Sequence, residues 1–177
     1  MAEKKWILDP THSEVQFKIK HLMITNVTGS FNIFSASVET DNEDFTRATI
    51  SFTADVASID TGNAQRDAHL QSADFFDADK YPHIKFVATK YEKIDNDGSY
   101  ELYGDLTIKE VTRNIELSVE FGGVVTDPYG QTKAGFTLNG KINRKDFGLS
   151  YNAALETGGV LLGEEVKLNI ELQFVKQ

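Results

Sequence analysis

The segment from Ser58 to Phe76 holds the side chains best suited to chemistry, because it gathers acidic groups, a base and a group that titrates near neutral pH. Paired carboxylates beside a histidine are a typical arrangement for general acid–base catalysis. Aspartate is also common at helix starts for electrostatic reasons alone. The charged or titratable members of the segment are Asp60 at its start and then Arg66, Asp67, His69 and Asp74.

Elsewhere, the sequence gives little support for a metal site, a catalytic nucleophile or a cofactor site. The four histidines lack the spacing on one helical face or on alternate strand positions that metal sites favour. Ser13 and Ser58 lack the glycine pattern of a nucleophile elbow, and the chain has no cysteine and no glycine-rich phosphate loop. We therefore expect a protein that is not an enzyme and that uses no metal or cofactor. The histidines are His12, His21, His69 and His83.

Basic residues recur in the segments expected at one end of the fold, and two interpretations of them stay open. They could bind an anionic or carbonyl-bearing head group. They could equally tie surface segments to the fold, Arg66 through Asp67 or Asp74 and Arg144 through Asp146. The residues concerned are Arg66, Lys109, Arg113, Arg144 and Lys145.

The same charged segment carries the helix signals of the chain. Asp60, Thr61 and Asn63 are good N-cap residues, and residues 64–72 contain no Gly, Pro or β-branched residue. Nearly everything else alternates apolar and polar residues. The sequence therefore predicts one short helix inserted into a chain of strands.

Eight stretches alternate with a period of two, which indicates strands with one dry and one wet face. A change of phase between Ile33 and Phe34 predicts a β-bulge. A closed barrel removes sheet edges, and a two-sheet sandwich is the alternative. We predict one domain over residues 1–177, an all-β, eight-stranded up-and-down antiparallel barrel with a short helical insert between strands three and four. The stretches cover residues 15–21, 27–38, 48–56, 84–88, 102–108, 115–121, 134–142 and 166–174.

The connections divide between the two ends of such a barrel. Compact turns at residues 41–44, 95–98 and 127–130 would share one end. The helical insert and the long loop from Asn143 to Gly163 would share the other. Because long loops on a rigid scaffold commonly carry function, we expect binding at this elaborated mouth.

Composition limits the partners. The 177-residue chain has a net charge of −9, which argues against nucleic acid and anionic membranes. No apolar run approaches the length of a membrane span, so we expect no membrane insertion. The N-terminus lacks a signal-peptide pattern. We expect a cytoplasmic protein, or a periplasmic one only if a leader has been removed.

The motifs, in order along the chain, resemble those of the YceI-like family. They are Trp6-Ile7-Leu8-Asp9-Pro10-Thr11-His12-Ser13, Ser58-Ile59-Asp60-Thr61-Gly62, Arg66-Asp67-Ala68-His69-Leu70, Asp74-Phe75-Phe76-Asp77, Val111-Thr112-Arg113 and Ile142-Asn143-Arg144-Lys145-Asp146-Phe147-Gly148. The resemblance implies a bacterial, lipocalin-like barrel, often dimeric, that binds an amphiphile with a long isoprenoid tail. A polyprenyl lipid or an isoprenoid quinone is the expected ligand, and a homodimer the expected assembly.

These inferences give two sets of candidate binding residues. The tail would contact interior residues of the barrel, and mouth residues would cover the head group. The alternative is a stress-associated protein-interaction barrel whose core is filled by the same phenylalanines, and the sequence leaves this choice open. The interior set is Phe17, Ile19, His21, Phe31, Ile50, Phe52, Phe86, Leu106, Leu117, Phe136, Ile142 and Leu168, and the mouth set is Arg66, Asp67, His69, Phe75, Phe76, Arg113 and Arg144.

Overall fold

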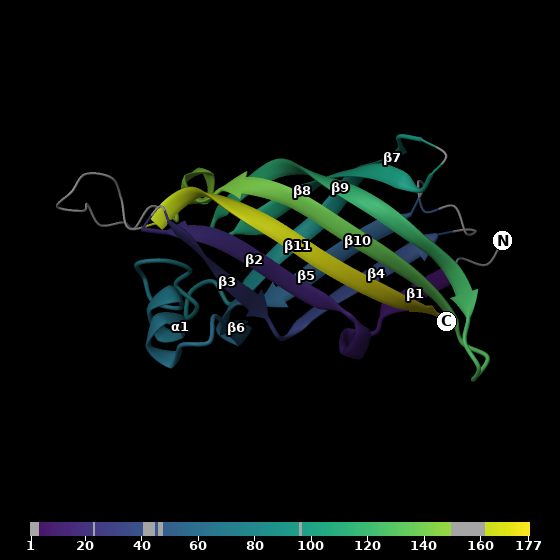
Figure 1. Ribbon diagram of the computed structural model, residues 1–177, viewed down its shortest axis with the longest axis horizontal. Coiled ribbons are helices and arrows are strands. Elements are labelled where there is room, and N and C mark those ends of the chain that lie inside the picture. Colours follow the sequence, from purple (N-terminus) through teal and green to yellow (C-terminus); the bar gives the residue numbers. More distant parts are fainter. Residues whose placement is uncertain (1–3, 23, 41–44, 46–47, 96, 150–161) are drawn as a thin grey trace.

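The computed structural model describes residues 4–22, 24–40, 45, 48–95, 97–149 and 162–177. Strands dominate, and one α-helix is present in the described part (Figure 1). The elements are β1 (Lys4–Leu8), η1 (Pro10–His12), β2 (Glu14–His21), β3 (Thr25–Phe31), β4 (Phe34–Thr40), β5 (Thr49–Asp55), η3 (Val56–Ser58), β6 (Ile59–Asp60), α1 (Ala64–Leu70), β7 (His83–Lys93), β8 (Ser99–Ile108), β9 (Val111–Thr126), β10 (Thr132–Asn143), η4 (Arg144–Phe147) and β11 (Leu162–Lys176).

The strands close into an eight-strand antiparallel barrel, as the alternation predicted. Closure comes from β1, which pairs with β11 on one side and with β4 on the other. Each strand buries the apolar face of its period-two pattern, and its polar face points outward. The helix lies between β6 and β7, which is the predicted place between the third and fourth long strands.

Two of the eight barrel positions are occupied by broken strands. β1 and β2 pair in turn with the two halves of β11, and η1 interrupts them at Pro10, which cannot donate to a ladder. β3 and β4 form the second broken position. The phase change at Ile33 is therefore a complete break between strands rather than the predicted β-bulge, and Ile33 is 61% exposed.

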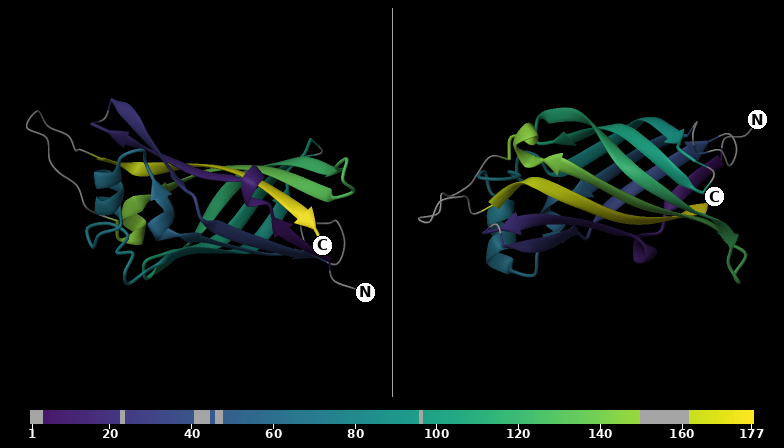
Figure 2. Two further views of the ribbon diagram at one scale, coloured as in Figure 1. Left: turned by 90° about the horizontal axis from the view of Figure 1, so that it is seen from below. Right: turned by 45° about the horizontal axis from the view of Figure 1, so that its top comes forward.

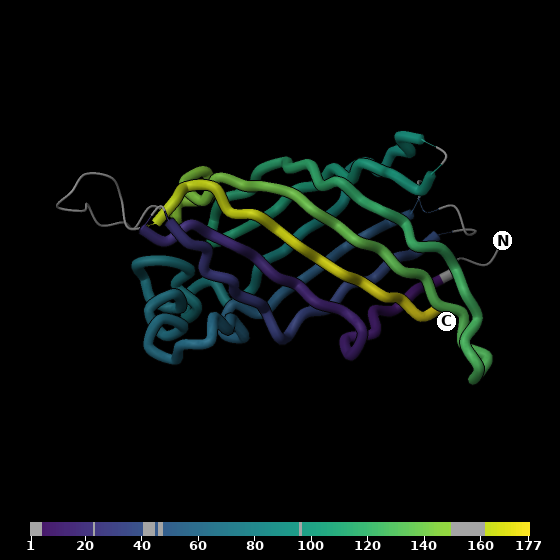
Figure 3. Tube along the Cα trace, viewed as in Figure 1, coloured from purple at the N-terminus to yellow at the C-terminus, as the bar shows by residue number. Residues whose placement is uncertain are grey.

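The two ends of the barrel differ as expected. α1 and η4 lie at one end, called the mouth here, and the start of β1 and the end of β11 lie at the other, called the base (Figures 1 and 3). The compact turn at residues 127–130 is at the base, where Asp127 Oδ1 accepts the backbone N–H groups of Tyr129 and Gln131. Residues 41–44 and most of the loop at 143–163 lie outside the described residues.

An aromatic cluster closes the base. Trp6 is fully buried, and its ring centroid lies 5.3 Å from that of Phe45. Phe45 in turn contacts Phe121 at 5.7 Å and Phe136 at 5.3 Å, both edge to face. Such arrangements add to the stabilisation from burial. We call Trp6, Phe45, Phe121 and Phe136 the base cluster.

Polar contacts fasten η1 to the barrel beside this cluster. Asp9 accepts hydrogen bonds from the backbone and hydroxyl of Thr11 and contacts His12 Nδ1 at 2.8 Å. Lys133 Nζ lies 3.9 Å from Asp9 and 3.5 Å from Asp127. The hydrogen bond from the Thr11 hydroxyl, followed by that of His12, lowers the pKa of Asp9.

This contact predicts how stability responds to acid. A group whose pKa is lower in the folded state stabilises the fold above its unfolded pKa, about 3.9 for Asp, and loses that effect as pH falls through the folded pKa. Asp9→Asn should therefore lower the free energy of unfolding at pH 7, and the difference from wild type should shrink below about pH 4. Urea unfolding at several pH values measures this, and a difference that does not change with pH would contradict it.

Candidate functional site

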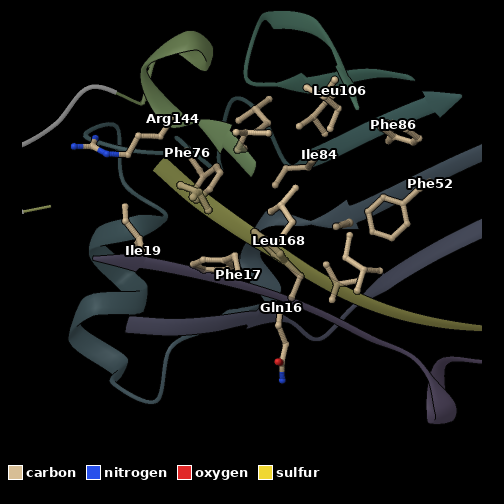
Figure 4. Close-up of a pocket in the computed structure, with 18 of the residues that line it drawn as sticks. Gln16, Phe17, Ile19, Phe52, Phe76, Ile84, Phe86, Leu106, Arg144 and Leu168 are labelled. Atoms are coloured by element: carbon tan, nitrogen blue, oxygen red, sulfur yellow. The ribbon is translucent and has the colours of Figure 1, made fainter. Parts of the chain in front are cut away.

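A cavity of about 540 Å³ lies inside the barrel and extends to the segment around α1 at the mouth (Figure 4). Its lining comes from most of the barrel strands and from the segment around α1. Nearly all of the lining is apolar; Gln16, Ser51 and His21 are among its few polar residues, and the Gln16 side chain points away from the cavity. The sequence left open whether side chains fill the bore, and the structure contains a cavity there.

Two glycines help to keep the bore open. Phe17 pairs across strands with Gly29, and a methyl group added to Gly29 would collide with the Phe17 ring. A Cβ on Gly104 would likewise collide with the Phe86 ring, although Gly104 pairs across strands with Ala88. Each ring thus occupies the space beside a glycine of the barrel wall. A larger residue at that position would push the ring into the bore. The phenylalanines that could have filled the core form part of its wall instead.

The segment from Thr61 to Pro82, called the lid here, covers the mouth of the cavity. Asn63 caps α1 by accepting the backbone N–H of Arg66. Thr61 then joins the helix to the preceding strand: its hydroxyl donates to Asp67 Oδ1 at 2.6 Å and accepts from Arg66 Nε at 2.7 Å. Arg66 also donates to the Thr61 carbonyl at 2.6 Å.

Aromatic side chains attach the rest of the lid. Phe76 packs edge to face on Phe31 of β3 at 6.1 Å, and Phe75 is buried beside His69. His69 Nε2 lies 2.9 Å from Asp74, so the histidine orders the lid as well as lining the cavity. At the far end of the lid, Tyr81 donates a hydrogen bond to Glu110 in the turn between β8 and β9.

Arg144 is the charged residue that the structure buries most clearly at the mouth. Only 3% of it is exposed, and burial lowers its pKa while the Glu164 carboxylate opposes that shift. Its guanidinium donates to the carbonyls of Leu149 and Gly163, the latter at 2.8 Å. These contacts hold η4 against the start of β11. The expected partner, Asp146, contributes its backbone carbonyl to Arg113 instead, at 3.3 Å.

The structure brings most of the candidate residues to one cavity. Of the interior set, all but Phe136 line it, and Phe136 belongs to the base cluster. Of the mouth set, Arg66, His69, Phe75, Phe76 and Arg144 line it. Asp67 serves the lid through Thr61, and Arg113 lies beyond the cavity lining, where its Nε donates to the Asp146 carbonyl. That a ligand touches these residues stays a prediction.

Several residues that shape the site escaped the sequence reasoning. Trp6 and Leu8 are buried in β1, a strand too short to stand out, although they alternate with the outward Lys5 and Ile7. Phe45 lies in a connection, so no periodicity marked it as part of the base cluster. Gln16, on the polar face of its strand pattern, also borders the cavity.

The described residues contain no group of three or more His, Asp or Glu side chains placed to hold a metal ion. In the same part of the chain, no helix has the length and apolar character needed to cross a membrane. The arrangement thus defines an antiparallel barrel with an internal, almost wholly apolar cavity under a polar lid. Such a site favours hydrocarbon and offers few groups for covalent chemistry.

Comparison with known proteins identifies the family. The model of the YceI-like domain matches residues 6–174, so the chain belongs to the YceI-like family. It is 41% identical over 167 residues to UPF0312 protein SAS2572 of Staphylococcus aureus, covering 94% of each chain. The Campylobacter jejuni YceI protein structure aligns with a TM-score of 0.76 at 41% identity, covering 89% of this chain and 90% of that one.

A more distant structure shares the fold. A polyisoprenoid binding domain from Saccharophagus degradans aligns with a TM-score of 0.72 over 97% of this chain and 98% of that one. Its sequence identity is 13%, so the likeness concerns the barrel architecture alone.

The glycine contacts can be tested directly. Gly29→Ala should push the Phe17 ring into the bore and destabilise the fold by about 1–3 kcal/mol, the usual cost of overpacking. In the Phe17→Leu background the same change should cost much less, because the colliding ring is gone. Urea unfolding of the four proteins gives the coupling energy. Equal costs in both backgrounds would show that Phe17 and Gly29 are not coupled.

Proposed function

We propose that the protein binds an isoprenoid lipid, a polyprenyl lipid or isoprenoid quinone, with the tail in the barrel and the head at the elaborated end. The observation that carries this proposal is the apolar cavity of about 540 Å³. The binding activity of the Saccharophagus degradans domain adds a precedent on the same fold. Among the described residues that line the cavity, no groups are arranged as a nucleophile and base, so we propose carriage or sequestration without covalent chemistry.

The size of the cavity suggests how much of a tail it holds. At about 30 Å³ for each water-sized group, 540 Å³ corresponds to about eighteen such groups, or between three and four isoprene units. Burial of each CH₂ contributes about 0.8 kcal/mol, which gives about 14 kcal/mol before other terms. Association costs about 4–15 kcal/mol. Useful affinity therefore requires a tail that fills most of the cavity.

The polar groups at the mouth are suited to retaining a ligand more than to attracting one. Arg66 and Arg144 donate to protein carbonyls, and Asp67 accepts from Thr61. The hydrogen bonds of these basic side chains thus go mostly to the lid and to the region of η4. We infer that the tail supplies most of the affinity and the head group sets its orientation.

The first prediction compares two substitutions of equal size. Ile50 lines the cavity, whereas Ile7 lies on the outside of β1 and is 42% exposed. Ile50→Trp should fill the bore and lower the affinity for retinol, a fluorescent isoprenoid alcohol, at least tenfold. Ile7→Trp should leave the affinity unchanged. Fluorescence titration measures both, and equal affinities in the two variants would contradict binding inside the barrel.

A second prediction concerns tail length. Affinity should rise by at least tenfold for each unit added from geraniol to farnesol to geranylgeraniol, because each addition buries more hydrocarbon. The gain should then level off once the cavity is full. Competition against retinol provides the dissociation constants. An affinity that does not depend on tail length would be inconsistent with a tail-filled cavity.

A further inference from the structure

Besides the lid, a second part of the barrel wall is held by few hydrogen bonds. The described ladder between β9 and β10 ends at the pair Asn139–Ser118, before either strand ends. β9 continues toward the mouth, paired only with β8 as far as Val111. β10 likewise continues with β11 as far as Asn143. The strands that run side by side at the base separate toward the mouth (Figure 2). We call this stretch the seam.

An outer hollow of about 560 Å³ follows the seam. Ile115 of β9 and Ile142 of β10 line this hollow and also line the inner cavity. At these two residues, therefore, the wall between the bore and the outside is one side chain thick. The four residues of β10 beyond the last pair give the seam a length of roughly 14 Å at about 3.4 Å per residue.

Side chains, rather than ladder hydrogen bonds, close the seam. Leu117 lies against the bare face of Gly140, where a Cβ would collide with its methyl group. Arg113 Nε spans the mouth end by donating to the Asp146 carbonyl at 3.3 Å, and the buried Phe147 of η4 packs there. Rotation of a side chain takes far less energy than the breaking of paired strands. The seam can therefore open while the rest of the barrel stays intact.

We propose that the seam is a lateral opening of the cavity, through which an amphiphilic ligand passes and in which its polar end is held. This inference rests on the proposed function and adds a route and a head-group site. The outer hollow is lined by two cations and two anions, so it offers no net charge to a phosphate or carboxylate. Its amides and hydroxyl both donate and accept, which suits a neutral hydroxyl or carbonyl head. The charged members are Arg113, Lys141, Glu116 and Asp146, and the neutral polar members are Asn114, Ser118, Asn139 and Asn143.

The backbone supports the same assignment. β9 residues between Val111 and Leu117 have no partner in the β9–β10 ladder, so that edge presents backbone N–H and C=O groups toward the hollow. A neutral head group in the hollow could bond to them while its tail passes between Ile115 and Ile142. The lid offers a different surface, because its polar groups are largely committed to Thr61.

A disulfide across the seam tests the proposal, since the chain contains no cysteine of its own. Glu116→Cys with Lys141→Cys places a pair at the second register position beyond the last ladder pair. Thr126→Cys with Thr132→Cys is the matched control at the base end of the same two strands, where the hydroxyls lie 3.5 Å apart. If the seam pair does not oxidise, a short bis-maleimide joins the same two thiols. Stopped-flow fluorescence with retinol gives the association and dissociation rates.

Locking the seam should slow association and dissociation by a similar factor of at least tenfold, and leave the dissociation constant nearly unchanged. Reduction of the disulfide should restore both rates, and the control lock should have no effect. Ile115→Ala widens the seam and should therefore raise the association rate. If the substitution only removed a contact between Ile115 and the ligand, the dissociation rate alone would rise. Retinol should bind more tightly than retinoic acid, whose carboxylate suits the neutral hollow less well.

The outcomes separate the two proposals. Retinol binding with rates that are the same in locked and reduced protein would overturn the lateral opening and leave the proposed function standing. Tighter binding of retinoic acid would overturn the neutral head-group site. Failure of the unmodified protein to bind retinol or any of the isoprenoid alcohols would overturn the proposed function, and the lateral opening with it.

Discussion

The structure depends on a balance between a closed wall and an unfilled interior. Ladder hydrogen bonds close the barrel through β1, and the base cluster around Trp6 and Phe45 seals one end. Protein interiors normally pack to crystal density, and an empty apolar volume forfeits dispersion contacts. Here the Phe17 and Phe86 rings occupy the space that a side chain at Gly29 or Gly104 would need, which leaves more of the bore open. A barrel that retains such a volume gains stability when hydrocarbon enters it.

The polar residues of the mouth serve this apolar interior indirectly. Thr61 joins Arg66 and Asp67 into one hydrogen-bonded unit, and Arg144 holds η4 through two carbonyls. A buried guanidinium needs such partners because its desolvation would otherwise destabilise the fold. On the proposed function, ligand binding therefore depends on a shaped apolar volume that is bounded by the lid and by the seam. The lid is fastened by side-chain hydrogen bonds, whereas the seam is closed mainly by Leu117, Ile115 and Ile142.

The sequence was sufficient for the barrel because period-two alternation determines which side chains face inward, and Asn63 with the residues after it marked the helix. Short or interrupted elements carried too little signal: β1 spans only Lys4–Leu8, and the break at Ile33 resembled a bulge. That a side chain points inward also does not tell how its ring is tilted or how deep in the barrel it lies. Phe17 and Phe136 have the same pattern, yet one lines the cavity and the other seals the base. The arginines donate to backbone carbonyls and, from Arg66, also to the Thr61 hydroxyl, and no spacing of charged residues reveals such partners.

The central claim is that the interior volume is a ligand site, and native mass spectrometry of freshly purified protein tests it most directly. The account predicts a species heavier than the polypeptide by the mass of an isoprenoid lipid, released intact when the protein is denatured. The same species should form when a polyprenol is added to lipid-free protein. A spectrum showing only the bare polypeptide, before and after addition of the polyprenol, would contradict the account.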